Sequence, residues 1–213
     1  MAEPVWIGLI IGLAALVQSL TGFGFALVAV SLLPLLMDLH AAVVLVISLS
    51  LVSNLVLLWH YRADFEWSRV GHLLGAALVT IPLGVLALNY VPEHLALRLL
   101  GGFILTYVVY SLLQLSPPNL SGVPWAYAFG AASGLLTGAF NTGGPPIVIY
   151  ASCNHWSPQQ FKGNMPGVFF ITSLVAIATH LWEGSVTSDL WQPIAYATPF
   201  FLCGLGLGLW LSR

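Results

Sequence analysis

The sequence predicts an all-α membrane protein, a polytopic helical bundle built from two inverted repeats, each beginning with a broken or re-entrant helix pair. Three observations lead to this prediction. The composition cannot cover a water-soluble surface, five long apolar stretches follow one another, and two further apolar regions are interrupted by glycines at corresponding positions.

Charged residues are too few for a soluble protein. Of the 213 residues, 59% are hydrophobic and 6% are charged, whereas a soluble domain carries roughly 25% charged residues. The lipid bilayer is therefore an expected partner. A net charge of -2 without a basic tract argues against nucleic acid. Cys153 and Cys203 stand in apolar surroundings without a Cys/His cluster, so we expect no disulfide framework, no zinc site and no cofactor.

Five apolar stretches have the length of a membrane-spanning helix, which needs about 20 residues. All five are bounded by polar or charged residues, and they are 40–60, 70–91, 95–115, 163–182 and 190–211. The first apolar stretch of the chain lacks basic residues before it, so we interpret it as part of the mature protein and not as a signal peptide.

Two apolar regions, 4–36 and 124–153, do not fit this pattern because each is too long for one helix and is interrupted near its middle. The interruptions are Thr21–Gly24 and Asn141–Gly144, the second followed by Pro145-Pro146. Each half is short for a full span, since 25–36 reaches only about 18 Å at about 1.5 Å per residue. We expect half-helices that meet at an unwound point, either as re-entrant hairpins or as short complete spans.

The basic residues distinguish between two topologies. If each broken region returns to the side it entered, Arg62, Arg69, Lys162 and Arg213 share one face, and Arg98 lies opposite. Basic residues gather on the cytoplasmic side of membrane proteins. We therefore expect the N-terminus outside and the C-terminus in the cytoplasm, in the plasma (inner) membrane.

The same topology predicts an internal repeat of opposite orientation. Residues 1–115 form one broken region and three spans, an odd number, so the second half (124–213, after a loop at 116–123) begins on the opposite side. The two breaks then face each other near the midplane, as in transporters that work by alternating access when one repeat rocks against the other.

A shift of 120 residues supports the repeat. It aligns Gly24 with Gly144, and it also aligns Ser53 with Ser173. Because glycine lets a ligand approach the backbone closely, the aligned breaks mark the expected binding site.

Neutral donors surround both breaks, and half-helix N-termini hold anions. Glutamine, asparagine and threonine supply side-chain donors, a proline suits the first position of a helix, and a basic residue attracts anions. The residues that we expect to bind substrate are Gln18, Thr21, Gly22, Phe23, Gly24, Asn54, Asn141, Thr142, Gly143, Gly144, Pro145 and Lys162.

Ionised side chains are absent from the middle of the predicted spans, where proton relays usually place one. An anion is therefore expected to be held by backbone dipoles and neutral donors. Any proton coupling has to use a histidine or act indirectly, and His60, His72 and His180 all stand near span ends, as interfacial residues do.

Other interpretations remain open at this point. The breaks could be kinks whose small residues allow tight helix packing. Gly130–Gly134 contains Ser133 in a small-residue context typical of intramembrane serine proteases, with His155 or His180 as a base, although Ala131 stands where such a motif has glycine. A metal carrier is disfavoured, because it should show clustered His, Cys or acidic ligands and the sequence has no such cluster. A channel-like protein, an exporter of another anion such as a carboxylate, and a non-transporting scaffold complete the alternatives.

Two segments resemble the signatures of a known family. Gly22–Val30, with Asn54 downstream, is similar to the first signature of the TauE/SafE family of sulfite and organosulfonate exporters. Gly138–Tyr150 is similar to the second, and Phe161-Lys162 resembles the aromatic-basic pair that follows it. The resemblance implies a transporter, not an enzyme, that exports sulfite or an organosulfonate. A homodimer is a further expected assembly. The residues themselves indicate only a small anion.

Overall fold

The computed structural model describes residues 3–113, 120, 122–185 and 191–212. The elements among them are all helical: α1 Glu3–Thr21, α2 Phe25–Leu32, η1 Leu33–Leu35, α3 Leu39–Tyr61, η2 Arg62–Asp64, α4 Trp67–Tyr90, α5 Glu93–Leu112, α6 Val123–Phe140, α7 Gly144–Cys153, α8 Pro158–Trp182 and α9 Trp191–Leu211. Most of the expected loop at 116–123, the expected end at 115, the expected start at 190 and Arg213 lie outside the described residues.

Six of the described helices are long and apolar enough to cross a membrane: α1, α3, α4, α5, α8 and α9. The all-helical membrane class is confirmed, and the five expected spans each coincide with one of these helices. The expectation that both halves of the first broken region are short is wrong for α1, whose 19 residues rise about 28 Å. Its partner α2 has only 8 residues.

Helix α8 begins at Pro158, earlier than the expected start at 163. A capping box explains the difference. The Ser157 hydroxyl accepts a hydrogen bond from the Gln160 backbone N–H, and the Gln160 side chain accepts one from the Ser157 N–H. Lys162 and Asn164 therefore lie in the first turns of α8. Asn164 Oδ1 accepts a hydrogen bond of 2.8 Å from the Glu66 N–H, which ties the α3–α4 connection to α8.

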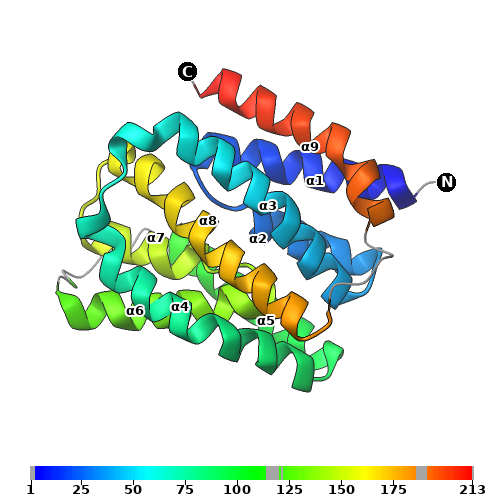
Figure 1. The fold of residues 1–213 in the computed structure, drawn as a ribbon, viewed down its shortest axis with the longest axis horizontal. Helices are drawn as coiled ribbons and strands as arrows, with labels where there is room; N and C mark the ends of the chain where they lie inside the picture. Colours follow the sequence, from blue (N-terminus) through cyan, green and yellow to red (C-terminus); the bar gives the residue numbers. More distant parts are fainter. Residues whose placement is uncertain (1–2, 114–119, 121, 186–190, 213) are drawn as a thin grey trace.

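Helices from the two halves of the chain alternate in the bundle. Helix α1 packs along α9, α4 packs along α6, and α3 packs against α8 between these two pairs (Figure 1). Glycines bring the backbones into contact, since a Cβ on Gly204 would collide with the Gly12 carbonyl, and one on Gly138 would collide with the Ile81 carbonyl. Close backbone approach of this kind is typical of helix pairs in membranes.

The glycine contacts also give the helix directions. Gly8 lies against Phe200 and Gly208 against Ser19, so α1 and α9 run parallel. Helices α4 and α6 likewise run parallel, because their contacts advance together along both helices. Gly163, near the start of α8, lies against Asp64, just beyond the end of α3, so α3 and α8 run antiparallel.

These directions settle how the broken regions run. Helices α1, α3 and α9 begin at one end of the bundle, and α4, α6 and α8 begin at the other (Figure 1). The α1–α2 and α6–α7 segments therefore form hairpins that return to the end of the bundle from which they started. Arg62, Arg69 and Lys162 share one end, and Arg98, near the start of α5, lies towards the other, as the first topology requires.

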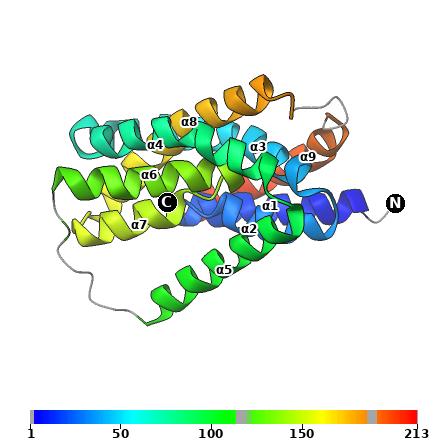
Figure 2. The same ribbon diagram turned by 90° about the horizontal axis from the view of Figure 1, so that it is seen from below.

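Helix α5 is the most isolated part of the described bundle. It stands at an angle away from the other helices in Figure 2, and only 11% of its apolar stretch is buried. Its start is fixed to α3, since the Glu93 carboxylate accepts a hydrogen bond of 3.1 Å from the Leu39 N–H. Most of its surface is therefore available to lipid.

Candidate functional site

The two breaks lie side by side inside the bundle. A Cβ placed on Gly144, at the start of α7, would be 3.3 Å from Cδ2 of Phe23 in the first break. A cavity of about 30 Å³ lies between them. It is lined by Gln18, Phe23, Gly24, Phe25, Ala26, Leu27, Ser50, Asn54, Thr137, Asn141, Thr142, Gly144, Phe169 and Ser173.

The first break is a glycine turn between α1 and α2. Gly22 and Gly24 have φ angles of 86° and 97°, in the left-handed region that favours glycine. The Thr21 hydroxyl lies 2.8 Å from the Val17 carbonyl and 2.7 Å from the Phe23 carbonyl. Thr21 is exposed and does not line the cavity, so its hydroxyl serves the turn.

The second break is held by side chains of α6. Asn141 ends α6 with a φ of 54°, a left-handed conformation that asparagine tolerates better than most residues. The Ser133 hydroxyl donates a hydrogen bond of 2.8 Å to the Gly143 carbonyl. A Cβ on Gly143 would meet the Ser133 carbonyl at 2.5 Å and would also collide with the Thr137 hydroxyl, so the loop fits only glycine at this position.

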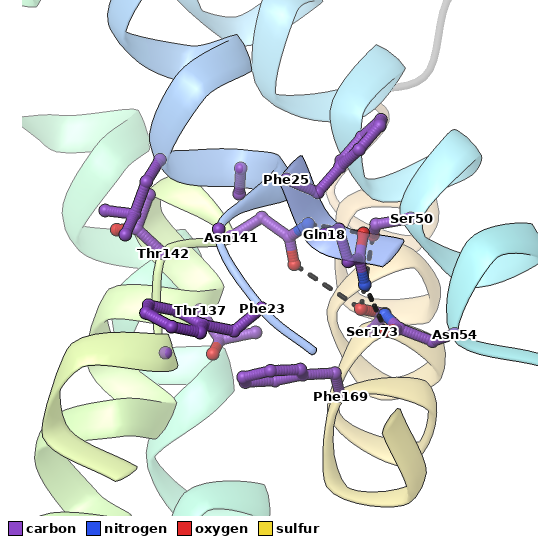
Figure 3. A pocket seen from close by; sticks show the side chains of 14 residues that line it. Gln18, Phe23, Phe25, Ser50, Asn54, Thr137, Asn141, Thr142, Phe169 and Ser173 are labelled. Atoms are coloured by element: carbon purple, nitrogen blue, oxygen red, sulfur yellow. Dashed lines mark hydrogen bonds between the residues drawn. The ribbon is translucent and has the colours of Figure 1, made fainter. Parts of the chain in front are cut away.

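Amide side chains from both breaks join hydroxyl groups of α3 and α8 (Figure 3). Gln18 Nε2 donates to Asn54 Oδ1 at 2.6 Å, and Gln18 Oε1 accepts from Ser53 at 3.2 Å. Gln18 and Asn54 are each 2% exposed. The hydrogen bonds fix the orientation of these amides at the cavity wall.

Asn141 makes the corresponding contacts from the second break. Its Nδ2 donates to the Ser50 hydroxyl at 2.9 Å, and its Oδ1 accepts from Ser173 at 3.4 Å. Ser50 and Ser173 themselves lie 3.5 Å apart. The break of each half is thus connected to the antiparallel α3–α8 pair at the centre of the bundle.

Thr142 carries a hydroxyl without a protein partner. The residue is 1% exposed and lines the cavity, yet its Oγ1 makes no hydrogen bond to the described residues. A buried hydroxyl without a partner costs about 1–3 kcal/mol. A polar ligand in the cavity would supply the missing partner.

Aromatic residues line the cavity on two sides (Figure 3). Phe23 packs edge-to-face on Phe161 at 5.9 Å between ring centroids, and Phe25 packs in the same way on Phe201 at 6.0 Å. Phe169 lies beside Phe23 and completes that wall. These rings therefore supply apolar walls beside the polar side chains.

The electrostatics of the cavity come from dipoles. None of the described residues that line it carries a charge. Helices α2 and α7 both begin at the cavity, and neither start has a side-chain cap. Pro145 and Pro146 have no N–H, so α7 contributes mainly its dipole and the Gly144 N–H. The positive ends of two helices and several neutral donors therefore face the same small space.

Seven of the twelve expected substrate-binding residues line the cavity: Gln18, Phe23, Gly24, Asn54, Asn141, Thr142 and Gly144. The other five, Thr21, Gly22, Gly143, Pro145 and Lys162, do not line it. Gly22 lies against Phe161 and Lys162, whose Cγ is 3.8 Å from the position of a Cβ on Gly22. Ligand binding by these twelve residues stays a prediction.

Comparison with known proteins identifies the family. Residues 7–213 match the family model described as Sulfite exporter TauE/SafE. The chain belongs to the TauE/SafE family. It is also 27% identical over 206 residues to a protein of Cupriavidus necator H16 named "Probable sulfite/organosulfonate exporter TauE", covering 93% of this chain and 80% of that protein. No solved structure matches the chain.

Membership of the TauE/SafE family settles the question of enzymatic activity, because the family consists of exporters. The geometry explains the serine that resembled a protease motif. Ser133 is fully buried, and its hydroxyl holds the second break through the Gly143 carbonyl. In this TauE/SafE protein Ser133 is a structural residue.

Sequence reasoning missed several residues of the TauE/SafE cavity. Ser50, Thr137, Phe169 and Ser173 line it, although none was among the expected substrate-binding residues. One of these residues, Ser173, could have been found from the sequence, because the 120-residue shift aligns it with Ser53. Ser50 and Phe169 gave no such signal because serine and phenylalanine are ordinary residues of membrane helices.

Proposed function

We propose that this TauE/SafE protein exports sulfite or an organosulfonate through the cavity between the two breaks. One observation carries the proposal: two helix N-termini and a set of neutral donors converge on one small cavity inside the bundle. The name of the Cupriavidus necator relative, which covers sulfite and organosulfonates, supplies the substrate class.

Oxyanions suit this donor set. A sulfonate or sulfite group has three oxygens that accept hydrogen bonds, and the cavity offers Gln18, Asn141 and Thr142 side chains with the first N–H groups of α2. In a low-dielectric interior such dipoles stabilise an anion without the desolvation cost of a buried arginine.

The cavity is too small for the substrate in this conformation. One water needs about 10–15 Å³, so a cavity of about 30 Å³ admits roughly two waters. Sulfite, with one sulfur and three oxygens, does not fit. The walls must separate for binding. A narrow central site that has to widen before substrate binds is compatible with an alternating-access carrier.

The helix pairing supports an inverted repeat but favours different moving units from those expected. The pairs α1–α9 and α4–α6, together with the antiparallel α3–α8 pair, form the pattern that a two-fold axis between the halves would produce. Each close pair combines one helix from each half. We therefore propose that the α1–α2–α9 unit moves against the α4–α6–α7 unit, instead of one repeat moving against the other.

Orientation follows from the basic residues. Arg62, Arg69 and Lys162 lie at one end of the bundle, and we place this end in the cytoplasm and the protein in the inner membrane. The Phe23–Phe161 pair then stands between the cavity and the cytoplasm, where Lys162 attracts anions.

Counterflow in proteoliposomes tests the proposal. Vesicles loaded with unlabelled isethionate, a sulfonate, or with sulfite should transiently accumulate the same labelled anion, which a carrier does and a channel does not. Vesicles loaded with acetate should not. Absence of flux for every sulfur anion would overturn the proposal, flux without counterflow would indicate a channel, and equal counterflow with acetate would indicate a broader anion carrier.

A further inference from the structure

His180 lies in the interior of the bundle, and neither break uses it. Among the described Asp, Glu, Lys, Arg and His side chains, it alone is fully buried, with 0% exposure. The expectation that it is an interfacial residue is therefore wrong. Ionisable groups inside membrane proteins are costly and mark ion pathways or proton sites.

The ring of His180 caps the last turn of α6. His180 Nε2 lies 3.3 Å from the Gly138 carbonyl oxygen. The N–H of Thr142, which would complete the helix at this carbonyl, bonds to Leu136 instead. Because a carbonyl oxygen only accepts, we assign the proton to Nε2. Nδ1 then carries the free lone pair, and it has no partner among the described residues.

This ring lies close to the cavity along two helices. Gly138 is three residues before Asn141, which lines the cavity. On α8, His180 follows Ser173 by seven residues, or about 10 Å of helix. A negative charge in the cavity would act on the ring through protein interior, where charges are weakly screened.

Few other charged groups face His180. On α3, which packs against α8, the nearby titratable group is His40, whose Nδ1 lies 3.9 Å from the Asp38 carboxylate. On α8 itself, Glu183 follows in the next turn. Of the remaining neighbours, α6 carries none of the five ionisable residue types, and the charged residues of α4, η2 and the start of α8 lie at the opposite end of the bundle.

We propose that an anion entering the cavity draws a proton from solvent onto Nδ1 of His180, so that anion and proton are bound together. This inference rests on the proposed anion site. The proton makes the ring a cation, which the negative end of the α6 dipole favours and which the bound anion attracts. One positive charge then offsets one negative charge in an interior that otherwise offers the anion dipoles alone.

Linkage gives the size of the effect. Two unit charges about 10 Å apart at an effective dielectric constant of about 20 change each other's binding constant by roughly tenfold. By reciprocity, anion affinity should rise roughly tenfold from pH values well above to values well below the titration of the ring.

Calorimetry on the purified full chain measures the proton directly. Isethionate is the probe because it stays singly charged across this pH range, so any proton that moves belongs to the protein or the buffer. Titration in two buffers of different ionisation enthalpy should show uptake of up to one proton per anion bound. If isethionate binds but no proton is taken up at every pH tested between 5.5 and 8, the inference is overturned and the proposed anion site still stands.

His180→Gln and His72→Gln form a matched pair of variants. A glutamine amide at 180 can still donate to the Gly138 carbonyl but does not titrate, and His72 is an exposed histidine. Proton uptake should disappear in His180→Gln and persist in His72→Gln, and uptake that persists in both would overturn the inference. If His180→Gln does not fold, the wild-type measurement decides. Failure of wild-type protein to bind isethionate or sulfite would overturn the proposed function, and this inference with it.

Discussion

Ser53 and Ser173 make the same contact in the two halves of the chain. Ser53 donates to the side-chain oxygen of Gln18 at 3.2 Å, and Ser173 donates to that of Asn141 at 3.4 Å. Each serine is on the helix that follows a hairpin, and each holds an amide at the break in its own half. The two serines are 120 residues apart and the two amides 123, so similar contacts at nearly the same separation favour the inverted repeat over kinks of independent origin.

Asn54→Asp should abolish high-affinity anion binding. The substituted carboxylate can still accept the hydrogen bond from Gln18, so the wall keeps its shape, but a negative charge at the cavity should weaken anion binding by at least tenfold. Isethionate-dependent thermal shift at pH 8 checks this. Asn89→Asp, at an exposed position near the end of α4, is the control, and equal binding by the two variants would contradict the site.

Thr142→Val should separate binding from stability. The valine keeps the shape of the side chain but removes a hydroxyl that has no protein partner, so stability should stay the same or rise by up to about 1 kcal/mol, whereas anion affinity should fall by about tenfold. Ser133→Ala removes a made hydrogen bond and should lower stability by about 1 kcal/mol. Thermal melts with and without isethionate measure both, and unchanged affinity in Thr142→Val would count against a ligand at this hydroxyl.

Gly143→Ala should destabilise the second break. A Cβ there meets the Ser133 carbonyl and Thr137 hydroxyl, and overpacking costs about 1–3 kcal/mol. Gly75→Ala, in α4, meets no atom within 4 Å and should instead be neutral or stabilising by up to about 1 kcal/mol. Thermal unfolding in detergent compares the two, and a Gly143→Ala protein as stable as Gly75→Ala would show that the loop is not closely packed.

Lys162→Met should slow substrate capture. Lys162 flanks the first break without lining the cavity, so its charge should act on approaching anions and not on the bound one. We expect KM for isethionate counterflow to rise several-fold with kcat unchanged, and the difference from wild type to shrink at 1 M salt, where the Debye length is about 3 Å. Lys162→Arg should retain wild-type KM, and a loss confined to kcat would contradict a capture role.

The helical membrane class, the five expected spans and the positions of both breaks could be predicted because each depends on local composition. Apolar runs determine the spans, and the glycines at 22, 24, 143 and 144 determine the breaks. Helix α8 was predicted to start too late because its first turn, around Gln160 and Lys162, is polar and its capping box lies outside the apolar run.

The cavity wall was harder to predict because it depends on which helices meet. Ser50 and Phe169 reach the cavity through the packing of α3 against α8, which no local pattern reveals. His180 shows the same limit. Its position near the end of a span predicted an interfacial residue, but the neighbouring helices bury it completely.

The interleaved helices mean that neither half of the chain can complete its own interior. Gly12 and Ile81 present backbone to Gly204 and Gly138 of the other half, so a fragment ending before the α5–α6 connection would leave bare grooves along α1 and α4. That fragment and the remaining one, which begins at the α5–α6 connection, should each be unstable when produced alone. Produced together in the same cell, they should associate into one complex.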